Sequence, residues 1–167
     1  MIKVGLFFFL LLVAGKVFGD EGIIEISYEE AKLSLLSEKG EKIREFPVAV
    51  PQFKPKVSFK GYVSGIERNP FWIPTKGTRE AYAKKFGREL PEMLRPGDPR
   101  NAMGIGKIKI TFDDKKIDPT IRIHGTNDEK SIGQRISRGC IRLKNADITE
   151  LMDLIQKKNI LVKFSAT

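Results

Sequence analysis

The sequence predicts one mostly-β domain with one or two short helices. Short segments alternate between apolar and polar residues, most clearly Ile24–Ser27 and Ile108–Phe112, which is the period of a half-buried strand. Only two stretches carry apolar residues at helical spacing. The chain of 167 residues shows no internal repeat, linker or break in composition. We therefore expect a single β-rich domain over residues 23–164.

Further strands are expected where apolar runs meet turn residues. The polar stretch Ser37–Glu41 predicts a hairpin turn. The run Ile121–His124 places its isoleucines on one face and Arg122 and His124 on the other, so His124 can reach out of the sheet. The other expected strands are Leu33–Leu35, Ile43–Val50, Val57–Val63 and Leu161–Phe164.

The stronger helix is expected from Asp147 to about Lys158. Asp147 and Glu150 have the spacing of a capping box, and Asn159 is a plausible stop. The apolar stripe of this helix comprises Ile148, Leu151, Leu154 and Ile155.

A second, shorter helix is expected over Thr78–Phe86, where Gly87 would end it. The Pro- and Gly-rich stretch Leu90–Pro99 that follows predicts a long ordered loop near a functional face.

Residues 1–19 have the pattern of a secretory signal peptide. Lys3 precedes an apolar run, and small or tolerated residues stand before Asp20. The apolar run is shorter than the roughly 20 residues that span a bilayer. We expect cleavage, export to the periplasm or cell wall, and no stable membrane insertion afterwards; an uncleaved anchor is the alternative.

The chain is basic, with 30 Lys and Arg against 21 Asp and Glu and a formal charge of +9. Removal of residues 1–19 takes away two lysines and no acids, which leaves +7. In an exported protein this charge suggests an anionic, carboxylate-rich polymer or anionic lipid, or serves solubility alone. We expect no nucleic-acid partner, because no nucleic-acid motif is present.

The chain has one cysteine, Cys140, and one histidine, His124. A disulfide framework, a CxxC pair and a cysteine-rich zinc site are therefore excluded, and we expect neither metal nor cofactor. Cys140 is a buried apolar thiol, an intermolecular disulfide partner or a nucleophile. Arg138 and Arg142 flank it and would favour a thiolate, while Gly139 permits close approach of a substrate.

Several segments resemble the L,D-transpeptidase (YkuD, ErfK-type) family. Its catalytic signature is similar to Ile123–Asn127 (IHGTN), Ser131–Gly133 (SIG) and Ser137–Leu143 (SRGCIRL). Two further family segments resemble Asn69–Pro74 (NPFWIP) and Pro99–Gly104 (PRNAMG). Residues 24–50 are similar to the family's opening strands, so nearly all of the expected domain is covered.

The resemblance implies a YkuD-like β-sandwich and a cysteine acyltransferase that works on peptidoglycan. Cys140 would attack the bond between a diamino acid and D-alanine in a tetrapeptide stem, forming a thioester. His124 would act as base and then as acid, with its ring oriented by the Gly125 carbonyl; Asp128 could substitute for that carbonyl. The amides of Gly139 and Cys140 would hold the oxyanion.

The resemblance also implies a set of substrate-binding residues. Arg142 would hold a stem carboxylate or support the cysteine loop, or instead form a surface ion pair with an acid such as Asp147. Ser137 would steady that loop by a hydrogen bond, or simply favour the turn. We expect Trp72 and Phe71 in the core, or otherwise in a lid or pocket wall. The full set is Arg142, Ser137, Arg138, Asn127, Thr126 and Trp72.

Two departures from the family pattern bear on substrate choice. Arg138 replaces the histidine that usually precedes the Gly-Cys pair. The segment Lys54–Phe59 keeps the family's Pro and Phe and lacks its Thr and Gly, which affects a pocket edge.

The acceptor stays open at the level of sequence. It is a stem amine, a D-amino acid or a wall-linked lipoprotein in a transpeptidase, and water in an L,D-carboxypeptidase. A non-catalytic cell-wall-binding protein is the alternative of another class. A thiol-redox protein is disfavoured, because there is no resolving cysteine.

Overall fold

The computed structural model describes residues 21–156 and 159–165, and the expected signal peptide lies outside them. Ten strands, two α-helices and one 3-10 helix are assigned within those ranges. In chain order they are β1 (Glu21–Ser27), β2 (Lys32–Ser37), β3 (Lys42–Pro47), β4 (Val50–Pro51), β5 (Phe59–Arg68), α1 (Lys76–Phe86), β6 (Gly106–Phe112), β7 (Arg122–His124), η1 (Glu129–Ser131), β8 (Arg135–Ser137), β9 (Ile141–Arg142), α2 (Asn145–Leu154) and β10 (Asn159–Ser165).

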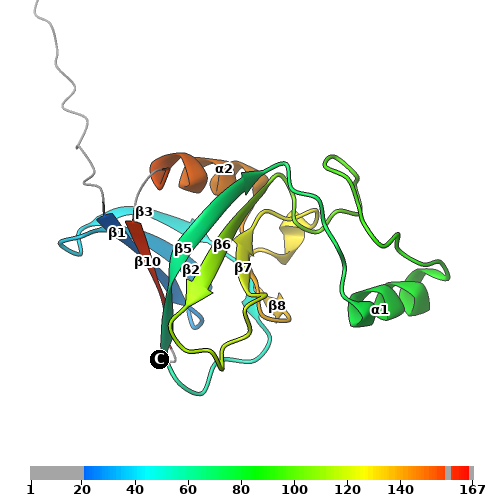
Figure 1. The fold of residues 1–167 in the computed structure, drawn as a ribbon, viewed down its shortest axis with the longest axis horizontal. Helices are drawn as coiled ribbons and strands as arrows, with labels where there is room; N and C mark the ends of the chain where they lie inside the picture. The colour runs from blue at the N-terminus through cyan, green and yellow to red at the C-terminus, as the bar shows by residue number, and fades with distance from the viewer. Residues whose placement is uncertain (1–20, 157–158, 166–167) are drawn as a thin grey trace, which may run out of the picture.

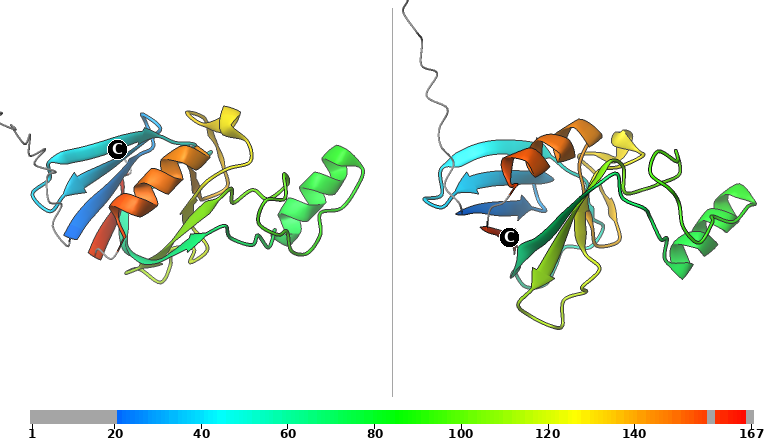
Figure 2. Two further views of the ribbon diagram at one scale, coloured as in Figure 1. Left: turned by 90° about the horizontal axis from the view of Figure 1, so that it is seen from above. Right: turned by 45° about the horizontal axis from the view of Figure 1, so that its top comes forward.

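Eight strands form one sheet in the order β3-β2-β1-β10-β5-β6-β7-β9. The pairs β1–β10 and β7–β9 are parallel, and the other neighbours are antiparallel. The sheet curls, so that its β1–β3 half and its β5–β7 half both turn towards α2 (Figures 1 and 2). A second sheet of two strands joins β4 to β8. The mostly-β prediction is confirmed, with the sandwich formed by one continuous curled sheet.

The hydrophobic core lies between the curled sheet and α2. Strands β1 and β10 alternate between buried and partly exposed residues along their length, as the sequence pattern requires. Ile24, Ile108 and Phe164 are completely buried, and Ile148 of α2 packs into the same cluster. This core supports β6 and β7, the strands that lead to the His124 segment.

Most of the expected strands are confirmed, with shifted boundaries. The hairpin turn at Ser37–Glu41 joins β2 to β3. The expected strand Ile43–Val50 is broken into β3 and β4, because Val48 turns away to bond Ala31 and Gly133. The expected strand Val57–Val63 starts two residues later and continues to Arg68 as β5, since Val57 is exposed.

The helix α2 begins two residues before the predicted start. Its N-cap is Lys144, whose side chain makes no capping hydrogen bond, so the capping box at Asp147 and Glu150 is wrong. Glu129 of η1 instead accepts a hydrogen bond from the Asn145 amide at 3.0 Å. The helix ends at Leu154 and not near Lys158, which lies outside the described residues.

The segment between β5 and β6 leaves the body of the domain and carries α1 (Figure 1). Thr75 caps α1, and Gly87 ends it at a φ of 66°, as predicted for this glycine. No residue of α1 is buried. Trp72 and Leu94 close the base of the excursion by a pair of backbone hydrogen bonds of 3.0 and 2.8 Å. The predicted Leu90–Pro99 loop therefore forms the returning arm.

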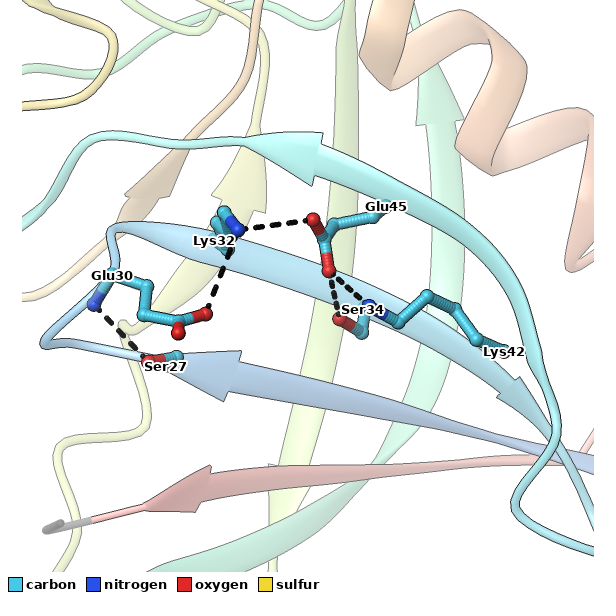
Figure 3. A network of polar contacts seen from close by, with 6 residues as sticks. All are labelled: Ser27, Glu30, Lys32, Ser34, Lys42 and Glu45. Carbon is cyan, nitrogen blue, oxygen red and sulfur yellow. Dashed lines mark hydrogen bonds and ion pairs between the residues drawn. The ribbon is translucent and has the colours of Figure 1, made fainter.

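The edge strand β3 carries charged side chains that form ion pairs. Glu45 contacts Lys32 and Lys42, and also accepts a hydrogen bond from Ser34 (Figure 3). The two lysines hold the pKa of the Glu45 carboxyl down at about 2. Charged side chains on an exposed edge disfavour pairing with another chain.

Candidate active site

The strands β7 and β9 bring the histidine and cysteine segments together. They pair in parallel, with Ile123 opposite Ile141 and His124 opposite Arg142. Cys140 directly precedes β9. If the register is continued by one residue, Cys140 lies opposite Arg122, which is two residues before His124 in β7. Alternate residues of a strand share a face, so Arg122 and His124 share one face of β7, and continuation of the register places Cys140 beside Arg122.

The His124 ring is buried. Its Nδ1 lies 2.6 Å from the Gly125 carbonyl oxygen, so this nitrogen donates and Nε2 is left with the lone pair. Burial lowers the His124 pKa to about 4. The hydrogen bond to the Gly125 carbonyl and the nearby Ala102 backbone raise this pKa, while Arg142 and Lys107 lower it further. The imidazole is therefore neutral at pH 7.

The Cys140 thiol is partly buried and unpaired. Its Sγ lies 3.8 Å from the Thr120 carbonyl oxygen, and no hydrogen bond joins it to the His124 ring. Burial raises the pKa of the thiol, and the lowering by Arg122 and Arg142 does not outweigh it. Arg142 thus favours the thiolate, as expected of one flanking arginine, but burial outweighs this effect and the resting thiol is neutral.

The loop before Cys140 is held by Ser137. The Ser137 hydroxyl donates to the Cys140 carbonyl at 2.5 Å and accepts from the Gly139 amide at 3.3 Å. Ser137 is buried, so these contacts are shielded from water. Of the two sequence interpretations of Ser137, the hydrogen-bonded support of the loop is the one observed.

Gly139 is required by its backbone conformation. Its φ of 155° is one that residues with a side chain rarely adopt. A Cβ at this position would make only an ordinary contact of 3.7 Å with Ile121, so space remains beside the loop for another molecule.

A cavity of about 300 Å³ opens beside this loop. Its charged lining residue is Arg138, and no acidic residue lines it. Pro55 and Phe59 line it as well, so the segment Lys54–Phe59 does form a pocket edge. The remaining wall comes from Tyr28, Pro51, Gln52, Phe53, Ile121, Ser137 and Gly139.

Residues 21–162 match the family described as the L,D-transpeptidase catalytic domain, YkuD. The chain belongs to this family. It is 36% identical over 136 residues to the probable L,D-transpeptidase ErfK/SrfK of Salmonella typhimurium, covering 80% of this chain and 40% of that protein. It is 32% identical over 155 residues to the probable L,D-transpeptidase YcfS of Escherichia coli, covering 87% of this chain and 46% of that one. The chain thus spans less than half the length of these curated relatives.

Solved structures of L,D-transpeptidases share the fold of this YkuD domain. The catalytic domain of the Enterococcus faecium enzyme aligns with a TM-score of 0.55 at 17% identity, covering 86% of this chain and 96% of that one. An enzyme from Mycobacterium tuberculosis aligns with a TM-score of 0.55 at 13% identity, covering 84% of this chain and 59% of that one.

The two arginines that flank Cys140 in the sequence differ in their surroundings. Arg138 is exposed and lines the cavity, and its Nη1 lies 3.6 Å from where a Cβ on Gly77 of α1 would stand. Arg142 is half-buried, pairs with Ala49 through its backbone, and forms no ion pair with Asp147. The surface ion-pair interpretation of Arg142 is therefore wrong.

Thr126 and Asn127 are engaged with the protein itself. Thr126 is buried, and its hydroxyl accepts from the Asp128 amide at 3.1 Å. Asn127 is exposed and donates to the Pro99 carbonyl at 2.9 Å, which ties the histidine segment to the α1 excursion. Asp128 does not take the place of Gly125, because the His124 Nδ1 bonds the carbonyl.

The aromatic pair of the excursion is not in the core. Trp72 is half-buried at the base of the excursion, and Phe71 is 48% exposed. Both residues lie outside the lining of the cavity beside Gly139.

Sequence reasoning missed part of the cavity wall and one polar residue. Tyr28 and Phe53 reach the cavity from segments far from the signature, and nothing local marks them. The preference of asparagine for helix starts is the one local signal for Asn145, which lies in the first turn of α2. Within the described ranges, no group of three or more His, Cys, Asp and Glu could hold a metal ion, and no helix is long and apolar enough to span a bilayer.

Proposed function

We propose that this YkuD domain is a cysteine-dependent L,D-transpeptidase acting on peptidoglycan stem peptides. One observation carries the proposal: the His124 ring is fixed by the Gly125 carbonyl on the strand next to Cys140. That hydrogen bond commits Nδ1 as donor and leaves Nε2 as the base for the Cys140 proton. The family and the names of its curated members support the same reaction.

The first half-reaction is thioester formation. The Cys140 proton passes to His124 Nε2 as the sulfur attacks the carbonyl between the diamino acid and D-alanine. The tetrahedral intermediate collapses, the carbon–nitrogen bond breaks, and the imidazolium returns the proton to the leaving D-alanine amine. Because thiol and imidazole are both neutral at rest, proton transfer accompanies attack. The Cys140 thiol and the His124 ring are not hydrogen-bonded without substrate. Hydrogen bonds between catalytic groups often form or shorten only when substrate binds.

The oxyanion is stabilised by backbone amides of the cysteine loop. Loss of one such donor commonly costs about 2.7–4 kcal/mol in the transition state. The Gly139 amide makes only a long hydrogen bond of 3.3 Å to Ser137, which an oxyanion can replace at small cost. The Cys140 amide is the second donor in this scheme.

The cavity beside Gly139 is the binding place for the anionic part of the stem. Arg138 lines the cavity together with Pro51, Phe53 and Phe59, and no acidic residue lines it. A carboxylate on a short peptide therefore gains an ion pair there without opposition from a neighbouring anion. Arg142 lies too far inside to be fully solvated, and it supports the negative charge that develops on Cys140.

Export to the periplasm or cell wall completes the proposal. Residues 1–19 act as a signal peptide, and residues 23–164 are the exported catalytic domain. The net charge of +7 after cleavage draws the domain weakly, and in a salt-dependent way, to the carboxylates of the wall.

The test is product analysis with purified tetrapeptide muropeptides, with and without an added D-amino acid. The proposal expects cross-linked dimers or amine-exchanged products, and loss of both in Cys140→Ala and His124→Ala. Tripeptide alone would identify an L,D-carboxypeptidase with water as acceptor. No product from the folded protein under any acceptor, a wall-linked lipoprotein included, would contradict the proposal and favour a wall-binding protein.

A further inference from the structure

The peptide unit between Gly125 and Thr126 is held at both ends. Its carbonyl accepts from His124 Nδ1 at 2.6 Å. Its N–H, which belongs to Thr126, donates to the Asn145 Oδ1 at 3.3 Å. A trans peptide is planar, with its C=O and N–H pointing in opposite directions. Fixing the N–H therefore fixes the direction in which the carbonyl meets the His124 ring.

The Asn145 side-chain amide makes two further contacts that set its own orientation. Its Nδ2 donates to the Thr126 carbonyl at 2.9 Å, and its Oδ1 also accepts from the Ile105 amide at 3.2 Å. The Asn145 amide therefore both accepts from and donates to the backbone of Thr126. It also links Thr126 to Ile105, the residue before β6. Aspartate retains the acceptor and loses the donor, and alanine loses both.

Two glycines make room for this amide. A Cβ on Gly125 would lie 2.5 Å from Asn145 Oδ1, and a Cβ on Gly104 would collide with the same oxygen. Gly104 also has a φ of 62°, which favours glycine. The close packing leaves the amide little freedom to rotate.

The backbone of Asn145 is anchored in turn. Its N–H donates to Glu129 Oε1 at 3.0 Å, and its carbonyl accepts from the Thr149 hydroxyl at 3.0 Å. The residue opens α2, whose apolar face is packed into the core. The core-packed helix α2 is therefore connected through the Asn145 side chain to the peptide unit whose carbonyl orients the imidazole.

We propose that Asn145 is a positioning residue for His124, acting through the Gly125–Thr126 peptide unit. Its side chain keeps the Gly125 carbonyl aimed at Nδ1, which maintains the tautomer with Nε2 free to take the Cys140 proton. The catalytic consequence rests on the proposed function, whereas the effect on the ring does not.

The test uses the single histidine as a unique spectroscopic probe. Long-range ¹H–¹⁵N correlation spectra at pH 7 report which ring nitrogen carries the proton. We expect the Nδ1–H tautomer in the wild type, a mixture of tautomers in Asn145→Ala, and an intermediate result in Asn145→Asp. We expect the rate of Cys140 acylation to fall about tenfold or more in Asn145→Ala, with KM little changed, because small misplacements of a base are costly.

Thr149→Val is the matched control, because it removes a hydrogen bond to the Asn145 backbone and leaves the side-chain amide in place. It should lower thermal stability without changing the tautomer. Unchanged ring spectra in a folded Asn145→Ala or Asn145→Asp protein would overturn the proposal. If His124→Ala kept full activity while the tautomer still depended on Asn145, the proposed function would fail and the positioning role would stand.

Discussion

At the scale of single residues, the site is built from two neutral partners. Burial raises the pKa of Cys140 and lowers that of His124 to about 4, so neither group is charged at pH 7. A preformed thiolate–imidazolium pair would need the opposite shifts. The domain therefore depends on a well-placed base at the moment of attack, which is why the hydrogen bond to the Gly125 carbonyl matters.

Alkylation by iodoacetamide reports the protonation state of the Cys140 thiol directly, because the chain has one cysteine. With its pKa raised by burial, the thiol should react slowly at pH 5–7, with a rate that rises steadily beyond pH 9. His124→Ala should leave that profile nearly unchanged. A fast plateau near pH 6 that disappears in His124→Ala would show an ion pair and contradict the assignment.

Ser137→Ala removes both hydrogen bonds of the cysteine loop. Loss of a buried hydroxyl's contacts should lower the free energy of unfolding by about 1–3 kcal/mol and slow acylation of Cys140. Ser131→Ala is the matched control, since Ser131 is equally buried and donates to the Asp128 carbonyl away from this loop. Equal stability loss with equal acylation rates in both variants would refute a special role for Ser137. Urea unfolding and a carbapenem acylation assay measure the two effects.

At the scale of elements, the domain links its parts by contacts between residues distant in sequence. The α2 N-terminus takes its acceptor from Glu129, sixteen residues earlier, rather than from its own capping residue Lys144. This arrangement couples the 3-10 turn after the histidine segment to the helix that carries Asn145.

Glu129→Ala should therefore destabilise the domain by an amount typical of a lost cap, about 0.5–2 kcal/mol. Lys144→Asp should recover part of the loss in that background, because it supplies a local acceptor at the N-cap position. Thermal unfolding of the single and double variants measures both effects. A Glu129→Ala protein as stable as the wild type would show that the contact is not a cap.

Local patterns predicted the elements whose determinants are local. Alternation in Ile108–Phe112 and the turn at Ser37–Glu41 are properties of neighbouring residues, and so is the stop at Gly87. The start of α2 was misplaced because its cap comes from η1. The site residues His124 and Cys140 were found because they stand in contiguous motifs, whereas Tyr28 and Asn145 act only through distant contacts.

At the scale of the whole molecule, the curled sheet buries a titratable ring in its body. His124 has an ordinary pKa of 6.5 when unfolded and about 4 when folded, so the unfolded chain binds more protons between these values. Stability therefore rises with pH across this window and is lost as the pH falls from about 6.5 to 4. The largest loss from this one group is about 3 kcal/mol.

The prediction is checked by urea unfolding of the wild type and His124→Asn between pH 7 and 4. The difference in free energy of unfolding between the wild type and His124→Asn should shrink as the pH falls. Only the wild type has a buried ring whose low pKa favours the unfolded state in acid. Carboxylates such as Glu45 and Asp98, whose pKa values are held near 2, affect both proteins alike and cancel. Parallel curves for the two proteins would contradict the assigned burial of His124.

In the proposed reaction, Cys140 carries the acyl group during turnover. Intact-protein mass spectrometry after mixing with a tetrapeptide muropeptide or a carbapenem, followed by peptide mapping, detects this acyl-enzyme. We expect a single covalent adduct on Cys140, which forms in the wild type, forms more slowly in His124→Ala and is absent in Cys140→Ala. An adduct on another residue, or turnover by Cys140→Ala, would contradict it.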